Sequence, residues 1–116
     1  MKRRVVLASA LFAAGIPAAQ PQSRPLKIVV PFGAGTSTDI VGRVMAEALG
    51  RQLSQSVIVE NKPGAGGAIG SEQVARSGAD GQTLLLGTVG THAINPTLYK
   101  RLSYQPLRDF TPLGFV

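Results

Sequence analysis

The sequence predicts an α/β fold: a parallel sheet with flanking helices. Three short apolar runs, each followed by a loop rich in glycine or hydroxyl residues, alternate with segments of helical periodicity. The order strand, helix, strand, helix, strand needs crossover connections, which are typical of parallel sheets with helices on their faces. Right-handed crossovers place the three loops that follow the strands at one edge of the sheet. Open α/β sheets bind their ligands at this edge.

Residues 1–19 have the pattern of a secretory signal peptide. A basic start at residues 2–4 precedes an apolar stretch over residues 5–14 and a small-residue exit, with cleavage expected near Ala18 or Ala19. The apolar stretch is shorter than the roughly 20 residues that a membrane span needs. We expect Sec export to the periplasm, with a twin-arginine signal and a first core helix as the alternatives.

The charge pattern argues against a nucleic-acid partner. Half of the formal net charge of +6 comes from residues 2–4, and residues 20–116 carry nine lysines and arginines against six acids, or +3. These cations are scattered, with Lys100 and Arg101 as their one adjacent pair. A nucleic-acid binder gathers its cations on one face. We therefore expect no nucleic acid.

Cysteine and histidine counts exclude further classes. The chain has no cysteine and one histidine, His92, so it has no disulfide framework, and a metal site would need carboxylates almost alone. We expect neither a metal nor a cofactor. Residues 20–116 suffice for one small core, which we interpret as an incomplete N-terminal α/β lobe and expect to be monomeric.

The first unit begins with a short buried strand over residues 26–31. Gly33 and Gly35 then free the backbone to turn and expose its N–H groups. Thr36 and Asp39 fit Ser/Thr-x-x-Asp, a helix-start signature, and apolar residues at helical spacing predict an amphipathic helix over residues 38–53. A helix start with glycines before it can receive a carboxylate or phosphate, because its first N–H groups lack partners within the helix.

Several side chains of this first loop have two possible roles. The hydroxyls of Thr36, Ser37 and Thr38 can face a ligand or cap their own backbone. Phe32 can wall a site or pack beneath it. For Asp39 we favour a structural role at the helix start over a ligand contact, because its charge would repel an anion.

Two further units repeat the design. A second strand is expected over residues 56–60, followed by a glycine-rich loop and a helical pattern over residues 69–75. A third, fully buried strand over residues 82–87 leads into a small, hydroxyl-rich loop. The remaining expectations are a helical turn at 96–99, an extended segment over 102–109 and a strand that begins at 111.

Nucleotide and catalytic motifs fail on spacing. The third position of G-x-G-x-x-G holds Thr38 in the first loop and Ile69 in the second, and no Gly-Lys-Ser/Thr is present. Ser37 and Ser71 lack a G-x-S-x-G setting, and no carboxylate pair suggests acid–base work. His92 remains open between ligand contact, a local hydrogen bond and catalysis.

Four ordered motifs resemble the Bug family, the periplasmic solute-binding receptors of tripartite tricarboxylate transporters. They are Pro31-Phe32 through Asp39, Val57 through Gly67, Gly90-Thr91-His92-Ala93-Ile94-Asn95-Pro96 with Leu98-Tyr99, and Asp109-Phe110-Thr111-Pro112. The resemblance implies a type II periplasmic-binding-protein fold, whose two lobes close on a small solute. This chain resembles the front part of the first lobe.

The resemblance also implies ligand-binding positions in the three loops. These are Phe32, Gly33, Ala34, Gly35, Thr36, Ser37, Thr38, Gly66, Gly67, Ala68, Thr88, Gly90, Thr91 and His92. Two of them depart from the family pattern, since Thr36 stands where a second glycine is common and Ala68 where a polar residue is frequent.

The function that the resemblance implies is periplasmic binding of a small mono- or dicarboxylate and its delivery to membrane transporter subunits. Such a protein is a binder and performs no chemistry. Two alternatives remain at this point: a fragment of an exported α/β hydrolytic enzyme, and a solute-sensing signalling module.

Overall fold

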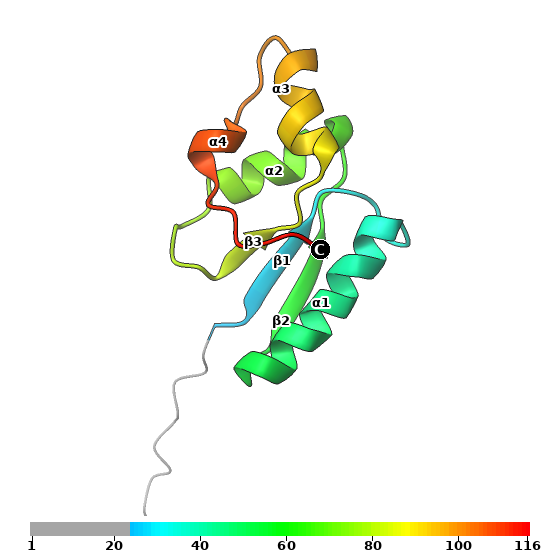
Figure 1. Cartoon of the computed structure of the whole chain (residues 1–116), viewed down its shortest axis with the longest axis vertical. Helices are drawn as coiled ribbons and strands as arrows, with labels where there is room; N and C mark the ends of the chain where they lie inside the picture. The colour runs from blue at the N-terminus through cyan, green and yellow to red at the C-terminus, as the bar shows by residue number, and fades with distance from the viewer. Residues whose placement is uncertain (1–23) are drawn as a thin grey trace, which may run out of the picture.

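The computed structural model describes residues 24–116, so the predicted signal peptide lies outside the described residues. Three parallel strands form a sheet in the order β2–β1–β3, with helices packed around it (Figure 1). The strands are β1 (Leu26–Val30), β2 (Val57–Asn61) and β3 (Thr83–Leu85). The predicted α/β class with a parallel sheet and flanking helices is confirmed.

Strand β1 lies at the centre of the sheet. Four of its five residues are apolar and at most 5% exposed. A central strand is covered on both faces, so apolar residues occur in a row and do not alternate with polar ones. Val30 is level with Asn61 of β2, and Val29 is level with Leu85 of β3. The three strands therefore end together, and the loops that follow them share one edge as predicted.

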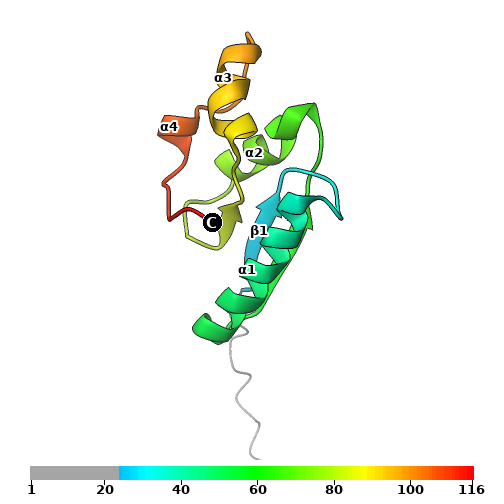
Figure 2. The same cartoon turned by 45° about the vertical axis from the view of Figure 1, so that its right-hand side comes forward.

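The helices divide between the two faces of the sheet (Figure 2). The longer elements are α1 (Ser37–Leu53) and α2 (Ala68–Ala75), and the shorter ones are the 3₁₀ turn η1 (Ala65–Gly67), the π turn η2 (Gly90–Ile94), α3 (Asn95–Leu98) and α4 (Pro106–Asp109). Ile28 and Val30 pack in one core cluster with Ala46 of α1. Val29 is buried on the opposite side of β1, where α2 lies.

Helix α1 forms where the apolar spacing predicted a helix and begins one residue earlier, but much of the predicted apolar face is exposed. Its buried positions Gly42 and Ala46 face the sheet, while Ile40 and Val44 on the other side are exposed. Ser54 ends the helix in the left-handed conformation, and its N–H donates to the carbonyl of Gly50. Among residues 24–116, no helix combines the length and the apolarity that a membrane span requires.

Gly70 lets α2 approach the sheet closely. A Cβ atom at this position would lie 2.8 Å from the carbonyl oxygen of Lys62 and 2.9 Å from the Cα of Pro31. Both neighbours are backbone atoms that cannot move aside. This contact holds the start of α2 directly beside the ends of β1 and β2.

The third strand differs from the prediction in length and burial. It spans three residues, Thr83–Leu85, and all three are half-buried, whereas a fully buried strand over 82–87 was expected. The reason is its position, because β3 lies at an edge of the described sheet and only β1 flanks it. Leu86, just after the strand, is buried in the core cluster.

Two expectations for the C-terminal segment are wrong. Residues 102–109 are not extended throughout, because α4 (Pro106–Asp109) forms where a proline at the first helical position presets the backbone. Residues 111–116 form no strand, and Phe115 and Val116 are exposed. A strand needs a neighbour with which to pair, and none of the described strands takes up this segment. The helical turn predicted at 96–99 is found one residue earlier, as α3.

Candidate functional site

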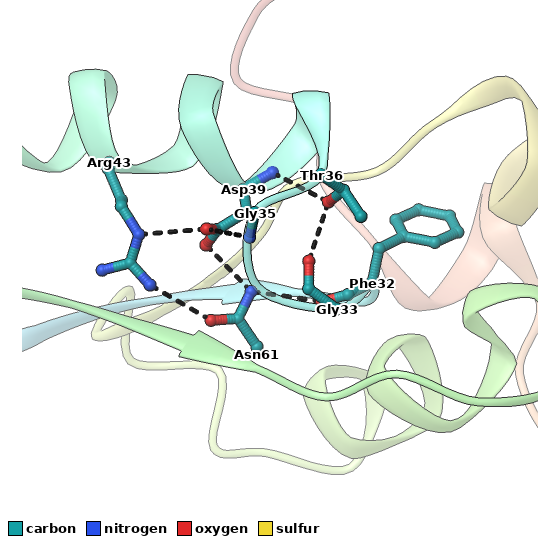
Figure 3. A network of polar contacts seen from close by, with 7 residues as sticks. All are labelled: Phe32, Gly33, Gly35, Thr36, Asp39, Arg43 and Asn61. Carbon is teal, nitrogen blue, oxygen red and sulfur yellow. Dashed lines mark hydrogen bonds and ion pairs between the residues drawn. The ribbon is translucent and has the colours of Figure 1, made fainter.

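The first loop is organised by a cap at the start of α1 (Figure 3). The hydroxyl oxygen of Thr36 accepts a hydrogen bond from the N–H of Asp39 at 3.3 Å and donates to the carbonyl of Gly33 at 2.8 Å. Thr36 itself is extended, with φ of −73°, so this position does not require the glycine that is common in the family. The Thr36 hydroxyl therefore caps the helix and stabilises the backbone of the loop.

Asp39 is buried at the centre of a polar network that spans the first loop, α1 and β2 (Figure 3). Its carboxylate accepts from the N–H of Gly35 at 2.9 Å, from Asn61 Nδ2 at 2.9 Å and from Arg43 Nε at 3.1 Å. These donors, the Gly35 N–H foremost, lower the pKa of Asp39 from 3.8 to about 2. Asp39 therefore stays ionised and holds the loop against the helix start.

Asn61 ties the same loop to the end of β2. Besides its bond to Asp39, its Nδ2 donates to the carbonyl of Phe32 at 3.1 Å, and its Oδ1 accepts from Arg43 at 3.4 Å. The charge of Arg43 balances that of Asp39 on this side of the loop. The repulsion that the Asp39 carboxylate would exert on a bound anion is thereby reduced.

The first turn of α1 keeps backbone donors that the described residues leave open. Within residues 24–116, the cap serves Asp39 and the Thr36 carbonyl accepts from Ile40, but no acceptor faces the N–H groups of Ser37 and Thr38. Ser37 is exposed and Thr38 is half-buried. The loop can therefore offer two N–H groups at the positive end of a 17-residue helix.

The three loops meet at Gly67. A Cβ atom there would lie 2.6 Å from Cγ2 of Thr91 in the third loop and 3.2 Å from Cζ of Phe32 in the first. Gly67 also has φ of +85°, a conformation that residues with a side chain rarely adopt. Phe32 thus packs against the second loop and the core cluster, which is the packing role considered for it, while a role as a wall of the site stays a prediction.

The third loop is held by its own hydroxyl groups. Thr91 is fully buried, and its Oγ1 accepts from the N–H of Thr88 at 2.9 Å and lies 2.7 Å from Nδ1 of His92. The half-buried His92 ring lies 5.2 Å from the ring of Phe110, and burial lowers the pKa of this histidine. His92 is therefore neutral near pH 7 and hydrogen-bonds locally.

A shallow hollow of about 430 Å³ lies on the α3–α4 side of the third loop. Its lining includes His92, Tyr99, Tyr104 and Arg108. His92 is the one ligand-binding candidate among its lining residues. This hollow is therefore distinct from the open donors at the start of α1.

The candidate residues differ in exposure. Ala34, Gly35, Thr36, Ser37 and Gly66 are exposed; Phe32, Gly33, Thr38, Ala68, Thr88, Gly90 and His92 are half-buried; Gly67 and Thr91 are buried. The structure brings Phe32, Gly67 and Thr91 together. Among residues 24–116, the hydrogen bonds of Gly35, Thr36 and Asp39 remain within the first loop, α1 and Asn61, and none reaches the third loop.

Four network residues were not among the predicted site residues: Arg43, Asn61, Asn95 and Tyr104. Asn61 carries a signal that could have identified it, because it directly follows a β-branched run and so stands at the carboxyl end of a parallel strand. Arg43, four residues after Asp39, has the spacing of a helical ion pair. Tyr104 carries no comparable signal, since its partners lie 9 and 13 residues earlier in the chain.

Candidate metal ligands and Ser71 of α2 also lie within the described residues. No group of three or more histidines and acids gathers anywhere in residues 24–116. Ser71 is fully buried, and its hydroxyl donates to the carbonyl of Gly67. Its hydroxyl serves the second loop.

The fold, an α/β lobe whose three loops share the carboxyl edge of a parallel sheet, fits the class of solute-binding proteins. The sequence model of the tripartite tricarboxylate transporter family receptor, TctC, matches residues 41–116. The chain belongs to this receptor family.

The relatives extend well beyond the part that this chain matches. The protein BugT of Bordetella pertussis (strain Tohama I) is 40% identical over 113 residues, which cover 97% of this chain and 35% of BugT. The chain thus spans about a third of the length of the curated relatives it matches.

Solved structures show the same fold. The periplasmic binding protein BugD is 48% identical with a TM-score of 0.75, and the match covers 78% of this chain and 30% of BugD. MatC from Rhodopseudomonas palustris with bound malate is 40% identical with a TM-score of 0.73, covering 77% and 30%. The lobe therefore corresponds to part of a periplasmic binding protein.

Proposed function

We propose that this chain forms one side of a site that binds a small mono- or dicarboxylate in the periplasm. The observation that carries the proposal is the pair of open N–H groups, on Ser37 and Thr38, in a first loop that Asp39 and Asn61 hold in place. Hydrogen bonds to a charged acceptor contribute roughly 1.5–3 kcal/mol each. The bound malate of MatC supports a carboxylate as the ligand class.

In the proposed function, the protein presents its solute to the membrane subunits of a transporter and performs no chemistry. Good sites enclose roughly 70–90% of a ligand's surface, and three loops on one lobe cannot do this. The 116-residue chain alone should therefore bind carboxylates weakly or not at all. Calorimetry that shows micromolar binding of a dicarboxylate by this chain would refute that expectation.

The decisive experiment combines this lobe with the rest of a two-lobed relative, so that both sides of the binding site are present. Residues 24–116 replace the matching segment of MatC, and malate binding to this chimaera is measured by calorimetry. We expect binding that is lost for a neutral diamide analogue. If the unaltered MatC binds malate and the folded chimaera does not, the proposal is wrong.

A single substitution tests the backbone donors themselves. Ser37→Pro removes one N–H, and proline is favoured at the first position of a helix. The preceding Thr36 has ψ of 162°, which suits a residue before proline. We expect Ser37→Pro to weaken malate binding by the chimaera at least about tenfold, the equivalent of one such hydrogen bond at the lower end of its range. The matched control Ser37→Ala keeps the N–H and removes the hydroxyl, and should bind within about twofold of the unmutated chimaera. An equal loss in both variants would assign the contact to the hydroxyl and not to the backbone.

Periplasmic location rests on the relatives and on the expected signal peptide. The solved relative BugD is described as a periplasmic binding protein. N-terminal sequencing of the protein recovered from the periplasm of an expressing bacterium tests the location, with a new N-terminus expected after Ala18 or Ala19. A protein that keeps Met1 and stays in the cytoplasm would contradict it.

A further inference from the structure

A buried polar bridge joins the second loop to the third. Asn95, at the start of α3, is 3% exposed, and its Nδ2 donates to the carbonyl of Gly66 at 3.0 Å and to the phenol oxygen of Tyr104 at 3.3 Å. Tyr104 is 2% exposed and donates to the carbonyl of Thr91 at 2.6 Å. The bridge thus runs from the second loop through two buried side chains to the third.

An apolar contact between Thr91 and Gly67 joins the same two loops a second time. Thr91, whose carbonyl receives the Tyr104 hydroxyl, also places its Cγ2 against Gly67, the residue that follows Gly66. The two loops are therefore joined at adjacent residues, once by packing and once by hydrogen bonds. A chain of buried hydrogen bonds of this kind is strengthened by mutual polarisation.

The second loop needs such a connection because of its composition. Gly64, Gly66 and Gly67 all have positive φ, and glycine loses more backbone freedom on folding than any other residue. A loop of this kind stays ordered only when other residues hold it. Asn95 of α3 and Thr91 of the third loop, which packs against Gly67, hold the second loop in this way.

We propose that Asn95 is a positioning residue of the solute site: it fixes the second loop against the third through Gly66 and Tyr104, and it tunes carboxylate affinity without touching the ligand. Its burial keeps it away from solute, so its effect is transmitted by the carbonyl of Gly66. Sites made of backbone dipoles depend on being formed in advance, because ordering a loop on binding subtracts from affinity. The effect on affinity rests on the proposed function, whereas the joining of the loops does not.

Amide hydrogen exchange of the 116-residue chain tests the joining of the loops. Asn95→Leu keeps the number and branching of the side-chain heavy atoms and removes the donor. The Gly67 amide donates to the carbonyl of Gly64 at 3.0 Å, and we expect its exchange to quicken about tenfold relative to the β1 amides. The control Ser103→Ala removes an exposed hydrogen bond to Glu72 in the same region and should leave exchange at the Gly67 amide unchanged.

Asn95→Asp adds a signature that general destabilisation would not produce. A protonated carboxyl group can donate to the Gly66 carbonyl, and an ionised one cannot. The Gly66 and Gly67 amide chemical shifts should therefore titrate with pH in this variant, with a transition that the unmutated chain lacks. Tyr104→Phe keeps the ring that packs edge-on against Phe110, removes the hydroxyl, and serves if Asn95→Leu does not fold.

The chimaera with MatC tests the effect on affinity. We expect Asn95→Leu to raise the dissociation constant for malate about tenfold, and Ser103→Ala to leave it within twofold. Unchanged exchange at the Gly67 amide in a folded Asn95→Leu variant would overturn the proposal, as would faster exchange with unchanged affinity. If the unmutated chimaera binds no carboxylate, the proposed function fails, while the exchange result still decides whether Asn95 joins the loops.

Discussion

A methyl group at Gly67 would lie 2.6 Å from the methyl of Thr91, so the second and third loops are as close as a residue without a side chain permits. The side chains of Phe32 and Pro31 bring the first loop to the same point. Three loops that are far apart in sequence therefore share one contact. Gly67 is the point at which all three loops come into contact.

Gly67→Ala should lower the free energy of unfolding by about 2 kcal/mol, because it combines a positive φ of +85° with a steric clash. Urea unfolding of the chain measures the change. Gly33→Ala is the matched control, since no atom lies within 4 Å of the Cβ that it adds.

Repeating the Gly67→Ala substitution in a Thr91→Ser variant separates the backbone strain from the steric clash. Thr91→Ser removes the clashing methyl and keeps the hydroxyl, so Gly67→Ala should cost less in this background than in the unmutated chain. An equal cost in both backgrounds would show that the backbone conformation alone is responsible.

Thr36→Ala should lower stability by about 1 kcal/mol, because it removes the hydroxyl that caps α1 and bonds to Gly33. Thr36→Ser keeps that hydroxyl and should remain near the unmutated stability. Thermal and urea unfolding measure both variants. Loss of equal size in the serine variant would mean that the methyl group, and not the cap, matters at this position.

Asn61→Leu should lower stability by about 2 kcal/mol, because Asp39 and the carbonyl of Phe32 lose a donor in a partly buried site. Arg43→Met is the comparison. Its side chain is 57% exposed, so its ion pair with Asp39 should contribute less than about 1 kcal/mol. The prediction is wrong if the arginine variant is the less stable of the two by urea unfolding.

The stability of the chain should fall as the pH drops from about 4 to 2. Asp39 has a folded-state pKa of about 2 against an ordinary value of 3.8, so the unfolded chain takes up a proton first. Glu60, paired with Lys27 and Lys62, has a pKa of about 2 against 4.5 and acts in the same direction. Stability from these groups is present above their ordinary pKa values and is lost as the pH falls through the folded-state values.

Urea unfolding at pH 5 and at pH 3 measures this dependence. Asp39→Asn should be less stable at pH 5 and should lose less stability between the two pH values than the unmutated chain. Glu47→Gln serves as the control, since Glu47 makes an exposed ion pair with Arg51. An unchanged loss in Asp39→Asn would show that the network does not favour the ionised carboxylate.

Local patterns predicted the parts of this lobe that depend on neighbours in sequence. The helix start at Thr36 and Asp39 was predictable because a cap joins residues three apart. The common edge of the three loops followed from the alternation of strands and helices. The third strand was misjudged because the burial of Leu84 and Leu85 depends on which strands flank them, and a run of leucines does not contain that information.

The residues that connect the loops could not be derived in the same way. Asn61 meets Asp39 across 22 positions, and Asn95 meets Gly66 across 29. The sequence shows that an asparagine stands at each position, but it does not show which residue the side chain contacts. That partner depends on the sheet order and on the close approach of α2 at Gly70. The side chain of Tyr104 became part of the network only because the segment before α4 folds back over η2.

The sequence by itself determined the α/β class, the three glycine and hydroxyl loops, the capped start of α1 and the resemblance to the receptor family. These follow from periodicity, local hydrogen bonding and backbone freedom, all of which act over a few residues. The tertiary structure decided that the loops converge on Gly67, that Arg43 and Asn61 hold Asp39, and that Asn95 and Tyr104 bridge two loops. Such contacts join distant parts of the chain, and only the packing of helices on the sheet brings those parts within hydrogen-bonding distance.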